Sequence, residues 1–230
     1  MAVIHNTTMT PGKLELLASW LPEQPWYTGA DREPRLSKAG GFRLDDPQGE
    51  VGIEFMAVTD TSGDRPVSYH VPLSYRGAPL AGAEQGLIGT SEHGVLGRRW
   101  VYDGVHDPVL IAQLLALLQG RAEPQAQNET GTRDPSVTVC FAGPGFTVDT
   151  RPTTVDDGPH GTRLLVDAES GPGPGSARRP MVEVARILRP DGQSPGPDAP
   201  RFRGHVTAGW RLPDGGVRRG RFVVLHDAAT

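Results

Sequence analysis

The sequence has a single cysteine, few lysines and no long apolar run. Cys140 has no second cysteine with which to form a disulfide inside the chain. Only two of the 23 basic residues are lysines, Lys13 and Lys38, and the net charge is -4. We therefore expect no nucleic-acid partner, because proteins that bind nucleic acids carry a basic surface with interleaved aromatic residues.

The longest apolar run, residues 109–118, is far shorter than the about 20 residues that span a bilayer. The N-terminus also lacks the pattern of a signal peptide, so we expect a cytoplasmic protein with no membrane partner.

Glycine and proline, in contrast, are abundant, with 30 glycines and 22 prolines in 230 residues. Average proteins contain about 7% glycine and 5% proline. The excess favours short strands joined by many turns over helical repeats or coiled coils. A hydrophobic content of 37% is sufficient for a globular fold, as one large domain or two small ones.

Two helices and a hairpin are predicted in the first half. Thr10 and Pro11 have the residue types of a helix start, and leucines follow at helical spacing up to Leu21. Residues 25–41 are interpreted as a polar loop. Residues 51–55 and 69–75 alternate apolar and polar side chains, which predicts two strands of an antiparallel hairpin. Pro72 lacks an amide hydrogen, so the second strand is expected at a sheet edge or with a bulge.

The second helix is predicted to begin at Asp107-Pro108 and to end near Gln119, with Gly120 as its stop. It is apolar on nearly every side, so it has to be buried. We expect it to pack against both halves of the chain and to join them.

The second half is predicted to be rich in strands. Residues 121–134 are polar and are interpreted as a linker or loop, and residues 171–176 and 190–200 as loops. Cys140 lies in an apolar stretch, so we expect it to be a buried small side chain. Five strands are expected, at residues 137–141, 162–166, 181–188, 205–212 and 217–225, with a hairpin turn at residues 212–217.

Three short segments of the first half resemble one known family. They are the pair Trp26-Tyr27 after a leucine-rich helix, the sequence Tyr-His-Val-Pro-Leu at residues 69–73, and the sequence Val-Tyr-Asp at residues 101–103 before a second leucine-rich helix. In this order they resemble the N-terminal cap domain of maltokinases over roughly residues 10–120, as it occurs in stand-alone actinobacterial proteins without the kinase domain. Residues 28–32 depart from the family, because the lysine-containing basic segment expected there is absent.

The resemblance implies an α+β fold. It would have a cap-like antiparallel sheet, similar to cystatin-like folds, with two main helices, followed by a β-rich C-terminal half. The implied domains are residues 1–120 for the cap-like domain, 121–134 for a linker or loop, and 135–230 for the β-rich region, which could pack on the first as one unit. Residues 135–230 are too short and too strand-rich for the catalytic lobe of a kinase, and no kinase catalytic loop occurs.

No group of side chains predicts catalysis or metal binding. Glu92-His93 and His106-Asp107 lack a third ligand, so a helix cap at Asp107 and two loop histidines are the preferred interpretation. His70 and Ser74 are too far apart along a strand for proton transfer. We therefore expect no catalytic residues, no metal and no cofactor.

Four residues are candidates for contacting a ligand or partner. Arg98 and Arg99 follow Gly94 and Gly97 in a flexible basic loop, which could bind a phosphate or an acidic surface. Trp26 and Tyr27 could stack on a sugar or could belong to the core, and both interpretations stay open.

These observations support three hypotheses for the function. The first is a non-catalytic accessory module in maltose, trehalose or α-glucan (glycogen) metabolism, with a sugar kinase or another glucan-metabolising enzyme as its partner. The second is a protein that binds an oligosaccharide or sugar phosphate between its halves, and the third is an enzyme of unrecognised type. The pathway in these hypotheses rests on the family resemblance alone.

Overall fold

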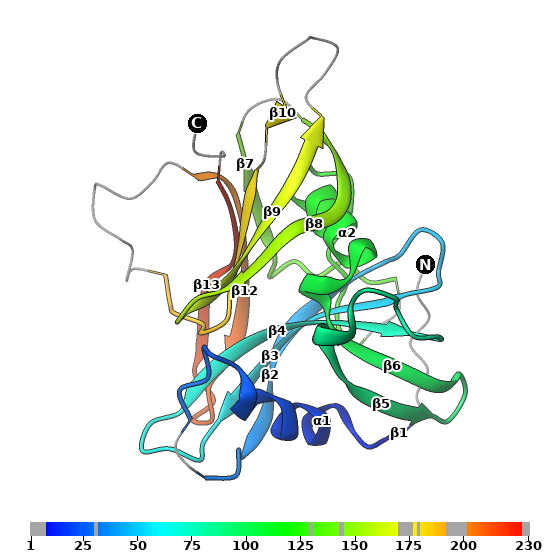
Figure 1. Cartoon of the computed structure of the whole chain (residues 1–230). Helices are drawn as coiled ribbons and strands as arrows, with labels where there is room; N and C mark the ends of the chain where they lie inside the picture. The colour runs from blue at the N-terminus through cyan, green and yellow to red at the C-terminus, as the bar shows by residue number, and fades with distance from the viewer. Residues whose placement is uncertain are drawn as a thin grey trace.

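The computed structural model describes residues 8–29, 32–128, 131–142, 145–169, 177–178, 180–191 and 202–226. Within these ranges the strands pair antiparallel in one 13-stranded sheet, whose order is β1-β5-β6-β4-β3-β2-β12-β13-β11-β9-β10, with β7 on β12 and β8 on β9. The described residues also form two α-helices and three short 3-10 helices (Figure 1). The N-terminal elements are β1 (Met9–Thr10), α1 (Lys13–Trp20), η1 (Leu21–Glu23), β2 (Leu36–Leu44), β3 (Gly52–Asp60), β4 (Val67–Arg76), η2 (Glu84–Gly86), β5 (Leu87–His93), β6 (Gly97–Asp103), η3 (Gly104–His106) and α2 (Pro108–Leu118). The C-terminal elements are β7 (Thr138–Phe141), β8 (Thr147–Asp157), β9 (Gly161–Glu169), β10 (Ala177–Arg178), β11 (Met181–Ala185), β12 (Phe202–Arg211) and β13 (Val217–His226).

The expected α+β class with two main helices is wrong, because the sheet dominates the fold. The helices have only 8 and 11 residues, whereas most strands of the cap and of β12 and β13 have 7 to 10. α1 is shorter than predicted because Gly12 is its N-cap and the chain tightens into the 3-10 turn η1 after Trp20. The segment that was interpreted as a polar loop also contains most of β2, a central strand of the sheet.

The predicted hairpin is confirmed as β3 and β4, which pair from Gly52↔Tyr75 to Asp60↔Val67. Contrary to the expectation for Pro72, β4 lies inside the sheet between β3 and β6. On the side away from β3, however, β6 pairs only with residues 73–76 of β4, and the amide of His70 bonds to Arg186 O. Pro72 falls between these two pairings, so its missing amide hydrogen leaves no ladder bond unmade.

The cap strands β2–β4 are covered on both faces. One face packs on α1, in a cluster that includes Leu17, Trp20, Met56 and Tyr69. The other face packs on α2 and on the C-terminal strands in a second, larger cluster. Figure 1 shows α1 and α2 on opposite sides of this part of the sheet.

α2 begins and ends as predicted. Asp107 caps it by accepting the amide of Val109 at 2.9 Å, and Gly120 follows its end with a φ of 71°. Six of its side chains are buried in the cluster that also contains Phe55 of β3 and Phe222 of β13. The helix thus contacts residues from both halves of the chain.

β2 continues the cap sheet into the C-terminal strands, since Gly40 pairs with Trp210 of β12. This approach requires glycine on β2. A Cβ on Gly40, whose φ is 146°, would lie 3.2 Å from Gly209 O of β12. Gly41 is required for a different reason, because its φ is 117° and a Cβ there would lie 1.9 Å from Phe55 O of β3. The predicted division into a cap, a linker and a C-terminal region stays a prediction.

Two further expectations concern the second half. All five predicted strands are found, as β7, β9, β11, β12 and β13, and the turn at residues 212–217 closes with Gly215 at a φ of 84°. The prediction that Cys140 is buried is wrong, because Cys140 is exposed, as are the two residues before it in β7. The expected loops at residues 171–176 and 192–200 lie outside the described residues.

We predict that Leu115→Asp destabilises the whole chain rather than one half. Leu115 is 1% exposed, and a carboxylate in a close-packed apolar site without a partner lowers the free energy of unfolding by more than about 4 kcal/mol. Urea unfolding followed by circular dichroism and by tryptophan fluorescence should show one shared transition, shifted for the variant. Gln113→Asp on a half-buried position of the same helix is the control. Separate transitions for the two probes would contradict the prediction.

Candidate functional site

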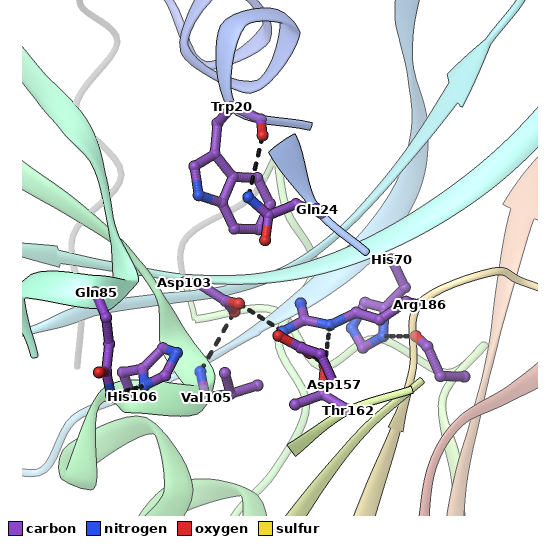
Figure 2. A network of polar contacts seen from close by, with 11 residues as sticks. Trp20, Gln24, His70, Gln85, Asp103, Val105, His106, Asp157, Thr162 and Arg186 are labelled. Carbon is purple, nitrogen blue, oxygen red and sulfur yellow. Dashed lines mark hydrogen bonds and ion pairs between the residues drawn. The ribbon is translucent and has the colours of Figure 1, made fainter. Parts of the chain in front are cut away.

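The most unusual group of polar residues surrounds Arg186, at the junction of the cap strands and the C-terminal strands. Arg186 follows β11 and its side chain is fully buried. Its Nη2 donates to Asp103 Oδ2 at 2.5 Å, and its Nε donates to Thr162 Oγ1 at 2.7 Å. Thr162 in turn donates to Asp157 (Figure 2). The cation is therefore held by β6, β9 and, through Thr162, β8.

The ring of Trp26 covers the same cation from the cap side. The guanidinium carbon of Arg186 lies 4.9 Å from the centroid of this ring. Such a cation–π contact is strongest where water is excluded, and Trp26 is 0% exposed. Within the described residues, Arg186 Nη1 and Trp26 Nε1 are buried without a hydrogen-bond partner. Each such group reduces stability by about 1–3 kcal/mol, so the salt bridge and the Trp26 ring hold Arg186 in place against that penalty.

His70 lies next to this group and is also fully buried. Its Nδ1 is 3.0 Å from Ala185 O, and its ring packs at 4.5 Å from Phe222 and 5.9 Å from Phe55. Burial lowers the pKa of His70 to about 3, and the nearby positive charge of Arg186 acts in the same direction. His70 is therefore neutral near pH 7, which suits a structural ring rather than a proton donor.

A pocket of about 240 Å³ opens beside this junction. Its wall is formed by residues 80–83, Gln85, His106, Pro108 and Val155, which come from the cap segment, the first turn of α2 and β8. His106 Nδ1 lies 3.4 Å from Gln85 Nε2. Burial lowers the pKa of His106; Asp103 opposes this shift, whereas Arg186 adds to it.

The four predicted contact residues are not gathered at one place. Trp26 is enclosed by Trp20 and Tyr69, at ring distances of 5.7 and 6.0 Å, so its ring is not open to a ligand. Tyr27 is half-buried and donates its hydroxyl to Asp60 Oδ2 at 2.7 Å. These two residues pack near Tyr69, at one end of β4.

Arg98 and Arg99 lie beyond the other end of β4, where Trp100 pairs with Arg76. Arg98 Nε donates to Glu92 Oε1 at 2.7 Å, and Arg99 Nη2 donates to Leu96 O at 2.6 Å. The structure therefore does not bring the aromatic pair and the arginine pair together. Whether any of the four binds a ligand or partner stays a prediction.

The two histidine pairs considered for a metal are also separate. His93 accepts the amides of Val95 and Leu96 at its Nδ1, at 3.2 and 3.0 Å. His106 lines the pocket, and Asp107 caps α2 as predicted while it binds Arg76 at 2.6 and 2.7 Å. Among the described residues, no three His, Cys, Asp or Glu side chains are grouped as a metal site would require.

The junction around Arg186 was not predicted from the sequence, although one sequence signal for it exists. Val182, Val184, Arg186 and Leu188 alternate along one predicted strand, so they share a face. The valines predict that this face is buried, and a cation on it predicts a buried acidic partner. The partner itself, Asp103, is 83 residues away and could not be identified from spacing.

One family comparison bears on this site. The model of the maltokinase N-terminal cap domain matches residues 20–107, from the last residue of α1 to the N-cap of α2. The predicted resemblance to a maltokinase cap domain is therefore confirmed for this segment. No curated protein matches the chain. In the part of the chain that the structure describes, every helix is too short or too polar to cross a membrane.

We predict that removing the Arg186 charge strongly destabilises the fold. Arg186→Met leaves the Asp103 carboxylate buried without its cation, and breaking a buried pair in this way costs about 3–5 kcal/mol. Adding Asp103→Asn should recover part of the loss, because the unpaired charge is then removed. Arg98→Met breaks an exposed pair and should change stability by no more than about 1 kcal/mol. Equal urea midpoints for Arg186→Met and wild type would refute this role.

We also predict that His70 makes the protein less stable in mild acid. The ring takes up a proton near pH 6.5 in the unfolded chain but only at about 3 in the folded chain. The unfolded state therefore binds more protons between these values, and the free energy of unfolding falls by about 1.4 kcal/mol for each pH unit below about 6.5. His106 and His205 contribute with the same sign, because their pKa values are also lowered by burial.

The test is the slope of the free energy of unfolding between pH 7 and pH 5. His70→Phe should reduce this slope by about 1.4 kcal/mol per pH unit, the contribution of one proton, whatever its effect on stability at pH 7. His160→Gln, at an exposed position, is the control. An unchanged slope in His70→Phe would show that the pKa of His70 is the same in the folded and unfolded states, which would contradict the prediction.

Proposed function

We propose that the protein is a non-catalytic binding module in maltose or α-glucan metabolism that acts on a separate protein, such as a sugar kinase of the maltokinase type. The cap-domain match supports the pathway. The position of the C-terminal strands supports the proposal that the protein is a binding module. β12 pairs directly with β2 of the cap, so strands of the same chain continue the cap sheet.

The tip of the β5–β6 hairpin is the main support for a binding role. Val95 and Leu96 are 62% and 45% exposed, although large apolar side chains are usually buried. The tip is nevertheless held firmly, because His93 accepts both of their amides and Arg99 donates to Leu96 O. A rigid apolar tip loses little conformational freedom on binding, which favours association with a matching surface.

The charges beside the tip indicate the kind of partner surface. Arg98 is paired with Glu92, and both side chains are more than half exposed. Arg99 adds a further positive charge next to the apolar pair. An apolar socket with an acidic rim would complement this tip, and the rim charges would mainly affect the rate of association.

A second candidate function is small-ligand binding, which the pocket beside His106 favours. Both parts of the chain contribute to its wall. This function does not exclude the first, because a ligand there would lie at the other end of β5 from the tip.

We predict that a Val95→Ser and Leu96→Ser double variant loses its protein partner and keeps its stability. The change removes two exposed apolar side chains, and surface substitutions usually alter stability by less than about 0.5 kcal/mol. Loss of two central contacts weakens binding tenfold or more, since each is worth about 1 kcal/mol or more at the centre of an interface. The measurement is analytical ultracentrifugation with a purified maltokinase-type sugar kinase.

Val217→Ser is the matched control, because Val217 is also 62% exposed but lies at the start of β13. Binding that tolerates the double variant would place the interface elsewhere. If wild-type protein shows no association with such a kinase, the proposed partner is wrong.

A further inference from the structure

We propose that the pocket beside His106 binds a neutral, hydroxyl-bearing ligand of the size of one sugar ring. This inference rests on the second proposed function, small-ligand binding, and names the class of ligand.

Among the described residues, no charged side chain lines the pocket. Leu80, Pro108 and Val155 supply apolar surface, residues 81–83 supply small side chains and backbone, and only Gln85 and His106 are polar. An ionised ligand would lose water here without gaining an opposite charge from the wall, which costs several kcal/mol. A neutral ligand with an apolar ring face avoids this penalty.

The two polar side chains match hydroxyl groups. Because burial lowers the pKa of His106, its ring is neutral near pH 7 and has one donor and one acceptor. Gln85 Nε2 donates to His106 Nδ1 at 3.4 Å, which leaves the ring Nε2–H as a donor and Gln85 Oε1 as an acceptor for a ligand. A hydroxyl group can donate and accept at once, so vicinal hydroxyls would match both groups.

His106 is fixed in position before any ligand arrives. A Cβ on Gly86 would lie 2.6 Å from Cδ2 of the His106 ring, so only glycine fits between the ring and η2. Asp103, which pairs with Arg186, also accepts the amide of Val105 and so holds η3. The buried junction thus orients the side chain that faces the pocket (Figure 2), and a preorganised group binds with less loss of entropy.

The volume limits the size of the ligand. About 240 Å³ lies below the about 300–1,000 Å³ of pockets that hold drug-sized ligands. One sugar ring is within this limit. A disaccharide would enter with one ring and leave the other in solvent.

The experiment uses three probes: glucose, maltose and glucose 1-phosphate. Each is titrated into the full chain by saturation-transfer NMR, which detects millimolar binding. We expect the two neutral sugars to bind and the phosphate to bind at least tenfold more weakly. Gln85→Ala should weaken neutral-sugar binding by about three- to tenfold, since it removes one or two hydrogen bonds. Ala81→Trp should abolish it by filling the pocket.

Matched controls separate the site from general effects. Gln48→Ala removes an exposed glutamine from the β2–β3 turn, and Ala78→Trp adds the same bulk at an exposed position outside the pocket wall. Both should bind the neutral sugars as wild type does.

Three results would overturn the inference, and they differ in what they leave standing. If glucose 1-phosphate binds in an Ala81-dependent way and the neutral sugars do not, the pocket is a ligand site but the class is wrong. If sugar binding is indifferent to both pocket variants, the protein binds a ligand at another place. If none of the probes binds, both the proposed small-ligand function and this inference are wrong, whereas the partner proposal is unaffected.

Discussion

The fold depends on one buried cation. Arg186 is fully buried, yet it follows a strand of the C-terminal half and pairs with Asp103 at the end of a cap strand. A buried charge is tolerated only when it is paired and hydrogen-bonded, so Arg186 restricts how the two parts of the chain can be arranged. If β9 or β6 were displaced, the guanidinium group would lose Thr162 or Asp103. Apolar packing around α2 favours association of the same parts, but it is not directional; the ion pair fixes the arrangement.

The same cation connects the elements that face solvent. Asp103 orients η3, whose last residue, His106, lines the pocket. Trp26, which covers the guanidinium, contacts Trp20 of α1 and Tyr69 of β4. The hairpin tip belongs to the other end of the strand that finishes at Asp103. The binding surfaces proposed for a ligand and for a partner are therefore the two ends of one strand, β6, that the junction anchors.

The sequence predicted the local features well, because they depend on neighbouring residues. The Asp107-Pro108 start of α2, the β3–β4 hairpin and the turn around Asp214-Gly215 all follow from residue types a few positions apart. β2 was not predicted because Gly40 and Gly41 weaken any strand pattern, yet Gly40 is what allows β2 to approach β12. β8 was missed as well, since Pro152 interrupts its pattern and coincides with register shifts against β9. The predicted fold class was wrong for the same reason. Helices have the stronger local sequence signals, whereas the long-range pairing that extends the sheet has almost no local signal.

The candidate site was harder to predict than the fold. Arg186 and Asp103 form an ion pair across 83 residues, and neither is unusual in its local sequence except that Arg186 occupies the buried face of a valine-rich strand. Trp26 stands in a polar segment, which gave equal weight to exposure and burial. Its burial results from contacts with Tyr69 of β4 and with Arg186, both of which are distant in the sequence. Where a residue is buried by a distant segment, its exposure cannot be deduced from its neighbours. A charged residue on an apolar strand face is therefore the more informative sequence signal, because the desolvation penalty requires a partner somewhere in the chain.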